Sequence, residues 1–231
     1  KKVHGILLTG GSAFGLAAAD GVMQYLEEHN IGYDTGIAKV PIVPGAVLFD
    51  LELGDASVRP DANMGYEACQ NASVQVSGQG NIGAGTGATV GKLRGIKRPV
   101  SAWLLKASLK AGRLIVAAIV VVNAFGDVID PSNGRIIAGT RHARKEEFIN
   151  TSLALRSPTV RTVLAFKNTV IGVVATNARL NVAQINEVAA AAHDGLARVI
   201  RPAHTLYDGD TFFSLATGHV RAHQILVSDM A

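Results

Sequence analysis

The chain has 231 residues, of which 48% are hydrophobic and only 17% charged, so we expect residues 1–231 to form a single domain with a substantial core. The formal net charge of +4 is small and the basic residues are scattered, which argues against a nucleic-acid partner. A single cysteine, Cys69, excludes an internal disulfide framework and fits a reducing, cytoplasmic compartment, and no apolar run is long enough to span a membrane.

The first predicted unit is a strand, a tight turn and a helix. An apolar run over residues 3–9 precedes Gly10-Gly11-Ser12, and apolar residues then recur at helical spacing as far as Leu26. Ser12 is the expected N-cap of this helix. A nucleophilic serine is the alternative, but the nucleophile elbow requires Gly-x-Ser-x-Gly, and Phe14 occupies the last position.

A stretch rich in glycine, proline and aspartate over residues 32–61 predicts short extended pieces, and a short helix is expected over 63–71. Gly78, Gly80 and Gly83 then match the dinucleotide pattern G-x-G-x-x-G. The acidic residue that this pattern requires about twenty positions later is missing, so no nucleotide cofactor is expected. We interpret the glycines as allowing the backbone to pass close to a substrate or to another segment.

Lys92 ends this glycine-rich stretch. A P-loop is excluded there, because Thr86 holds the first glycine position and Leu93 replaces the serine or threonine. Lys92 is either a solvated surface charge or a buried cation that lowers the pKa of a neighbouring amine.

The middle of the chain contains the clearest predicted strand. Residues 114–123 form a continuous β-branched run that we expect to be buried on both faces, whereas residues 103–109 look irregular or briefly helical. Asn123 ends the run, either as a turn residue or as an amide donor to an oxyanion. A turn over residues 130–134 then predicts a β-hairpin.

A polar link over residues 140–167 leads to the pair Asn168-Thr169, which opens a strand over 170–176. Thr169 is either an ordinary strand threonine or, if the preceding peptide bond is cut, an N-terminal nucleophile whose own α-amine serves as the base. A helix is expected over 182–198 with Asn181 as its cap, then a turn and a strand over 212–217. His193 lacks further ligands at suitable spacing, so no metal is expected.

Asp208 and Asp210 flank Gly209 in that turn. The two carboxylates could bind a hard cation, but calcium loops offer more oxygens than this turn does. Alternatively, they could anchor a cationic α-amine on a threonine or on a substrate.

Four segments, in this order, resemble the self-processing aminopeptidases typified by the L-aminopeptidase/D-alanine esterase-amidase, whose relatives include β-peptidyl aminopeptidases and nylon-oligomer hydrolase. The segments are Leu8-Thr9-Gly10-Gly11-Ser12-Ala13-Phe14-Gly15-Leu16, the run from Gly80 to Gly87, the run from Val122 to Asp127, and Asn168-Thr169 followed by the run from Ala203 to Thr211.

The resemblance implies an α/β fold, a four-layer α-β-β-α sandwich of the N-terminal-nucleophile type. It also implies self-cleavage between Asn168 and Thr169 into pieces 1–168 and 169–231, and a homotetramer of such two-piece units that acts on a small peptide or amide without a cofactor.

By position, the resemblance makes Thr169 the nucleophile, Lys92 the charge-tuning residue and Asn123 the amide donor. Asp208 and Asp210 would orient the amine of the nucleophile. Phe14, Gly83 and Gly85 are expected to border the substrate, and Phe14 stands where several relatives carry a tyrosine hydroxyl.

Three alternatives stay open at this point. One is an acyltransferase of the ornithine acetyltransferase type, which also cuts itself before a threonine on a related fold. Another is an esterase that depends on Ser12. The third is a non-catalytic binding or structural protein that kept the fold.

Overall fold

The computed structural model describes residues 2–74, 78–93, 100–157 and 168–231, and it is a mixed α/β fold as predicted. The predicted polar link falls partly outside these residues, because positions 158–167 are not among them.

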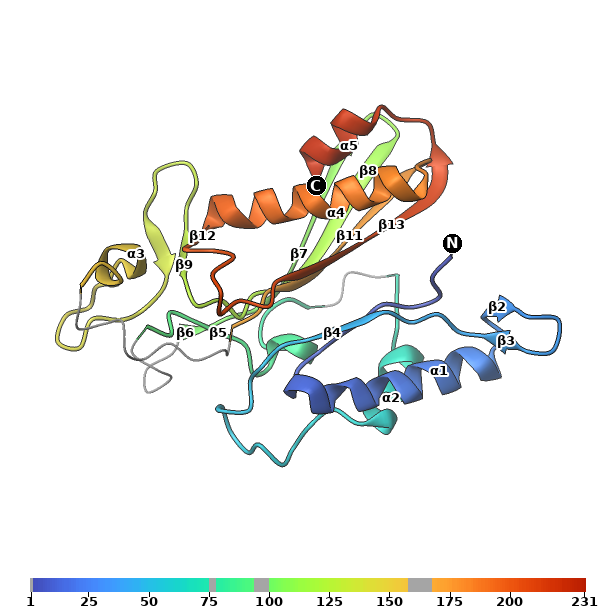
Figure 1. The fold of residues 1–231 in the computed structure, drawn as a ribbon, viewed down its shortest axis with the longest axis horizontal. Helices are drawn as coiled ribbons and strands as arrows, with labels where there is room; N and C mark the ends of the chain where they lie inside the picture. The colour runs from blue at the N-terminus through green and yellow to red at the C-terminus, as the bar shows by residue number, and fades with distance from the viewer. Residues whose placement is uncertain (1, 75–77, 94–99, 158–167) are drawn as a thin grey trace.

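A four-stranded sheet forms the centre of the molecule (Figure 1). Its order is β13 (Thr211–Val220), β11 (Ile171–Ala178), β8 (Leu114–Val121) and β7 (Leu104–Ala111). β11 runs antiparallel to β8 and parallel to β13, and Ile171 lies opposite a residue of each neighbour. The predicted strand after Thr169 is therefore an inner strand of the main sheet.

Two helices cover one face of this sheet (Figure 1). α4 (Val182–Val199) connects β11 to the parallel strand β13 by way of the short strand β12, and α5 (Gln224–Met230) packs beside it. α4 begins as the sequence predicts, because the side chains of Asn181 and Gln184 form a reciprocal capping box. Apolar residues of the sheet and of both helices form one buried cluster, which includes Val116, Val174, Val188, Ala192 and Val227.

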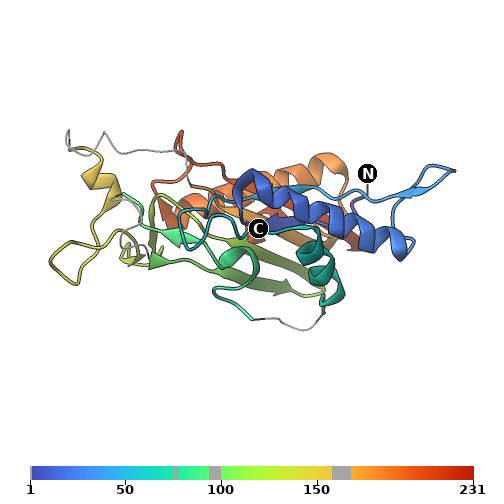
Figure 2. The ribbon, with the colours of Figure 1, turned by 90° about the horizontal axis from the view of Figure 1, so that it is seen from below.

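A second layered unit lies on the other side of the sheet (Figures 1 and 2). The parallel strands β1 (Leu7–Thr9) and β4 (Gly45–Val47) pair there, and helices α1 (Ala18–Glu28) and α2 (Ala62–Gln70) pack against each other. The two helices approach closely at Gly21, where an added Cβ would lie 1.7 Å from the Ala62 carbonyl oxygen. A glycine is therefore required at this crossing.

The remaining elements are short. They are η1 (Ser12–Ala17), β2 (Tyr33–Asp34), β3 (Lys39–Val40), η2 (Gly83–Gly85), β5 (Thr89–Val90), β6 (Val100–Ser101), β9 (Asp127–Ile129), β10 (Ile136–Ala138), α3 (Thr151–Ala154) and β12 (Ile200–Arg201). The predicted hairpin is confirmed, since β9 pairs antiparallel with β10. Figure 2 shows the β2–β3 hairpin extending beyond the end of α1.

Three local predictions were wrong. Residues 104–111 form an edge strand instead of an irregular segment, because pairing with β8 overrides a weak local preference. β8 is not buried on both faces: Ile115 and Ile119 are 41% and 42% exposed, since α4 and α5 cover only the opposite face. Ser12 is not a helix cap, because Gly11 precedes a short 3-10 helix and no side chain caps it.

A second buried cluster joins the two sides of the molecule around Leu48, Val90, Val121, Val170 and Ile171. It places the start of β11 deep in the protein, next to the glycine-rich stretch. No helix in the part of the chain that the structure describes is long and apolar enough to cross a membrane.

Candidate active site

The predicted nucleophile and the predicted scissile bond lie in contact. The hydroxyl Oγ1 of Thr169 donates a hydrogen bond to the Asn168 carbonyl oxygen at 2.5 Å. Asn168 is 4% exposed. Among the described residues, its side-chain Oδ1 is buried and has no hydrogen-bond partner. The Thr169 hydroxyl therefore lies beside the carbonyl group of the predicted scissile bond.

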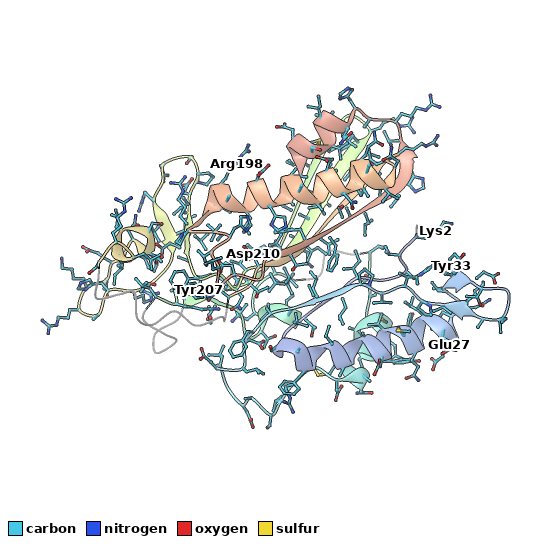
Figure 3. The ribbon with its side chains drawn as sticks, in the orientation of Figure 1. Lys2, Glu27, Tyr33, Arg198, Tyr207 and Asp210 are labelled. Atoms are coloured by element: carbon cyan, nitrogen blue, oxygen red, sulfur yellow. The ribbon has the colours of Figure 1, made fainter. Side chains whose placement is uncertain are left out.

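The loop before β13 holds this peptide from the other side. The Gly209 backbone N–H donates to the same Asn168 carbonyl at 2.9 Å, and Asp210 Oδ1 accepts from the Val170 N–H at 2.8 Å. Thr211 N then donates to the Val170 carbonyl, which begins the parallel pairing of β13 with β11. Figure 3 labels Asp210 on this loop, between the end of β12 and the start of β13.

Lys92, which is half-buried, and the fully buried Asn123 form a pair next to Thr169. Lys92 Nζ donates to Asn123 Oδ1 at 2.6 Å and to the Asn123 carbonyl oxygen at 3.2 Å. The same carbonyl oxygen accepts the Thr169 N–H at 3.0 Å. The fold therefore brings together Lys92, Asn123 and Thr169, three of the predicted site residues.

Burial lowers the pKa of Lys92 to about 7, against smaller opposing effects of Glu52, Asp208 and Asp50. The lysine is consequently a buried group that changes charge near neutral pH, and not the solvated surface cation that was the alternative interpretation.

The amide of Asn123 has a fixed orientation. Its Oδ1 accepts from Lys92 and from the Thr89 N–H at 3.1 Å, so its Nδ2 faces the Phe49 carbonyl oxygen and donates to it at 2.9 Å. An oxyanion role for Asn123 then depends on the second hydrogen of Nδ2, and it stays a prediction.

The two predicted aspartates bind different segments: Asp208 binds a residue of its own loop, and Asp210 binds the residue after Thr169. Asp208 Oδ2 accepts from the N–H and the hydroxyl of Thr205, both at 2.8 Å, while Asp210 binds Val170. Burial raises the pKa of the Asp208 carboxyl. In the structure, where Asn168 and Thr169 are joined, the backbone nitrogen of Thr169 bonds to Asn123, so orientation of a free amine by the two aspartates stays a prediction.

A cavity of about 460 Å³ lies beside the glycine-rich stretch, and the residues that line it include Gly10, Asp50, Arg59, Met64, Gly83 and Gly87. Gly83 thus borders this cavity, and its contact with a substrate stays a prediction. Gly85 is instead packed against Leu104, where an added Cβ would lie 2.6 Å from the backbone nitrogen. Phe14 is 57% exposed, and the Arg59 guanidinium stacks on its ring at 3.9 Å.

Three residues of this region were missed by the sequence analysis. Gly209 contributes only a backbone N–H, and His204 pairs with Asp210 at 2.8 Å between Nδ1 and Oδ2. Asp50 accepts from the Gly11 N–H at 2.7 Å and lies near Lys92. Only the position of Gly209 between two candidate aspartates was a signal in the sequence.

Ser12 has no comparable surroundings. Its backbone nitrogen donates to the Leu48 carbonyl oxygen, and within the described residues no histidine or carboxylate binds its hydroxyl. The serine alternative thus lacks the base that a nucleophilic hydroxyl needs.

A threonine hydroxyl bonded to a backbone carbonyl, with a lysine amine nearby, provides the types of group that nucleophilic catalysis on an amide uses. The family model of peptidase family S58 matches residues 2–231, and the chain belongs to this family.

Among its relatives is an uncharacterized aminopeptidase of Mycobacterium leprae (strain TN), which is 48% identical over 95% of this chain and 61% of its own length. A 6-aminohexanoate-oligomer endohydrolase of Agromyces sp. (strain KY5R) is 31% identical over 94% of this chain and 61% of its own length. The chain therefore spans about three-fifths of these relatives.

Solved structures show the same fold. The PH0078 protein from Pyrococcus horikoshii OT3 is 25% identical with a TM-score of 0.61, over 94% of this chain and 54% of its own. The L-aminopeptidase D-Ala-esterase/amidase from Ochrobactrum anthropi, described as a variant of the Ntn hydrolase fold, has a TM-score of 0.58 at 17% identity, over 90% of this chain and 52% of its own.

Proposed function

We propose that this protein is an amide-bond hydrolase that activates itself by cutting between Asn168 and Thr169, and then uses Thr169 as its N-terminal nucleophile. One observation carries the proposal: the Thr169 hydroxyl lies 2.5 Å from the Asn168 carbonyl oxygen, which also accepts the Gly209 N–H. Membership in a peptidase family and relatives named aminopeptidase and oligomer endohydrolase support an amide as the substrate class.

Self-cleavage would start with attack of Thr169 Oγ1 on the Asn168 carbonyl carbon. The C–O bond forms, the C–N bond of the peptide breaks, and the hydroxyl proton moves to the released amine. Water then hydrolyses the ester, which frees the carboxylate of Asn168 and the hydroxyl of Thr169. The Asn168 side-chain Oδ1 is buried without a hydrogen-bond partner, which costs about 1–3 kcal/mol of stability. Cleavage would let this side chain move into water and would remove that cost.

The mature enzyme would use the freed α-amine of Thr169 as its base. The neutral amine takes the hydroxyl proton, Oγ1 attacks the substrate amide, and an acyl-enzyme forms that water hydrolyses. The charged form of Lys92 lowers the pKa of this amine by repulsion. The acyl group would be attached to Thr169 Oγ1, and the Asn123 amide would donate to the oxyanion that forms on its carbonyl.

The finer features of the resemblance belong to the same proposal. The complete fold would be a four-layer α-β-β-α sandwich, which the arrangement of helices on both outer sides supports. The two-piece units would assemble as a homotetramer in the cytoplasm, and no metal or organic cofactor would take part.

The test uses wild-type protein and two single variants. Intact mass and N-terminal sequencing of the wild type should show two pieces, one of which begins at Thr169. Thr169→Ala should remain in one piece and fail to hydrolyse amino-acid p-nitroanilides, while the matched variant Ser12→Ala should be cut and active. An uncut Thr169→Ala protein with full amidase activity would sink the proposal.

A further inference from the structure

His204 lies between the candidate site and α4. Its ring atom Nδ1 is 2.8 Å from Asp210 Oδ2, and its Nε2 is 3.2 Å from the His193 carbonyl oxygen. The side chain of Asp210 is only 6% exposed, whereas that of His204 is 37% exposed. The backbone of His204 has φ +53°, a left-handed conformation that an L-residue adopts at a cost.

The hydrogen-bond partners of the ring determine its protonation. A backbone carbonyl oxygen only accepts, so Nε2 must carry a hydrogen. Asp210 Oδ1 accepts the Val170 N–H, and this bond favours the ionised carboxylate, which also only accepts. Nδ1 must then carry a hydrogen as well, and a ring protonated on both nitrogens is a cation.

We infer that His204 is a positively charged positioning residue that neutralises Asp210 and, through the bond from Asp210 to Val170, holds Thr169 in place. The catalytic part of this inference rests on the proposed function. The ion pair itself is inferred from the geometry alone.

The other charged groups around His204 come from two elements. Asp208 lies on the same loop, and its carboxyl interacts with both His204 and Asp210. His193 and Asp194 lie on α4, and the His193 ring is 5.0 Å from that of His204 between centroids. Burial lowers the pKa of His193, with the charge of His204 as a further cause, while Asp210 and Asp194 act in the opposite direction.

The charge of His204 has a defined effect on the free amine of Thr169. A bare Asp210 carboxylate would favour the protonated amine and raise its pKa. The His204 cation cancels this effect, so the amine is neutral, and able to act as a base, at a lower pH. The charges of His204 and Lys92 therefore both lower the pKa of the Thr169 amine, whereas the two aspartates raise it.

The ion pair is tested directly by nitrogen-15 NMR of the histidine rings in the uncut Thr169→Ala protein. We expect the His204 ring to be protonated on both nitrogens at pH 7, and this signal to be lost in the Thr169→Ala, His204→Gln double variant. A neutral His204 ring at pH 7 would overturn the inference, whether or not the wild type is an enzyme.

The catalytic consequence is tested by pH profiles of kcat/KM for single variants. His204→Gln keeps a hydrogen-bond donor but removes the charge, so the acid limb should move up by about one pH unit. His204→Lys restores the charge and should return the limb to the wild-type position. The matched control His219→Gln changes an exposed histidine on β13 and should leave the profile unchanged.

An acid limb that does not move in His204→Gln would refute a role of the charge in catalysis. If the wild type is neither cut nor active, the proposed function fails instead, and the NMR result still decides the ion pair.

Discussion

Lys92 shows how the fold changes the chemistry of a single residue. The lysine is buried against Asn123 beside Thr169, and its pKa falls from 10.5 to about 7. Close to neutral pH, roughly half of the molecules therefore carry a charge at this position, by the definition of a pKa. The resemblance implies a charge-tuning lysine, and the structure adds that this charge itself depends on pH.

This shift predicts how stability depends on pH. Between about pH 7 and pH 10.5 the unfolded chain binds a proton at Lys92 that the folded chain has lost. Stability should therefore rise with pH in this range, by at most about 1.4 kcal/mol per pH unit from this group. Replacement by methionine keeps the length of the side chain, removes the titration, and should abolish that part of the rise.

The measurement is urea unfolding of the wild type and of Lys92→Met at pH 7 and pH 9. The free energy of unfolding should increase more between the two pH values in the wild type than in the variant. Lys110→Met, at an exposed position of β7, serves as the matched control and should behave as the wild type. Equal pH dependence in all three proteins would contradict a depressed pKa for Lys92.

At the scale of secondary-structure elements, the loop between β12 and β13 completes the site. The loop meets the beginning of β11 in parallel register, with a bridge between Asn168 and Asp208 and full strand pairing from Ile171 onward. This register sets the Gly209 N–H on the Asn168 carbonyl. A turn that looks like a connection in the sequence therefore contributes a hydrogen-bond donor to the carbonyl of the proposed scissile bond.

Gly209→Ala tests this contact. An added Cβ would lie 3.1 Å from Thr169 Oγ1, closer than most such contacts, so the hydroxyl would have to shift by a few tenths of an ångström. Because misplacing a reacting group by about 1 Å can cost 10²-fold in rate, this smaller shift should slow self-cleavage by roughly several-fold. The rate is measured by following the uncut chain on denaturing gels after expression.

A second glycine provides the control. Gly195 lies on α4, and nothing is within 4 Å of the Cβ that alanine would add there. Gly195→Ala should be cut at the wild-type rate and be more stable by about 1 kcal/mol, because alanine is the better helix former. Cleavage of Gly209→Ala at the wild-type rate would show that this contact has no part in the reaction.

At the scale of the whole molecule, the expected cut would divide a single sheet. Residues 169–231 supply β11, α4, β13 and α5, whereas β7 and β8 precede the cut. Both buried clusters combine residues from the two sides, for example Val121 with Ile171 and Val116 with Val174. Separation of the pieces would expose this apolar surface to water, at a free-energy cost of about 25 cal/mol for each Å².

The two pieces should therefore stay together after cleavage. We expect a single peak in native size-exclusion chromatography that contains both pieces, at the same elution volume as uncut Thr169→Ala. The pieces should separate only in denaturant. Two separate peaks under native conditions would contradict a shared core.

Local patterns in the sequence were sufficient for much of the fold. The helix over Val182–Val199 follows from its apolar spacing and from the Asn181 cap, and the hairpin of β9 and β10 follows from its turn residues. These features depend on residues a few positions apart, so their physical causes can be read directly from the chain. The family resemblance selected Thr169, Lys92, Asn123 and the two aspartates in the same way, from short motifs.

Contacts between residues far apart in the chain could not be predicted from these local patterns. The strand at Leu104–Ala111 exists because β8 pairs with it, and the exposure of Ile115 depends on which face of the sheet the helices cover. The bond from Asp210 to Val170 joins residues 40 positions apart, and the bond from Lys92 to Asn123 joins residues 31 apart. A burial-induced pKa shift, a backbone donor at Gly209 and a charge at His204 arise only when the folded chain excludes water and brings such residues into contact.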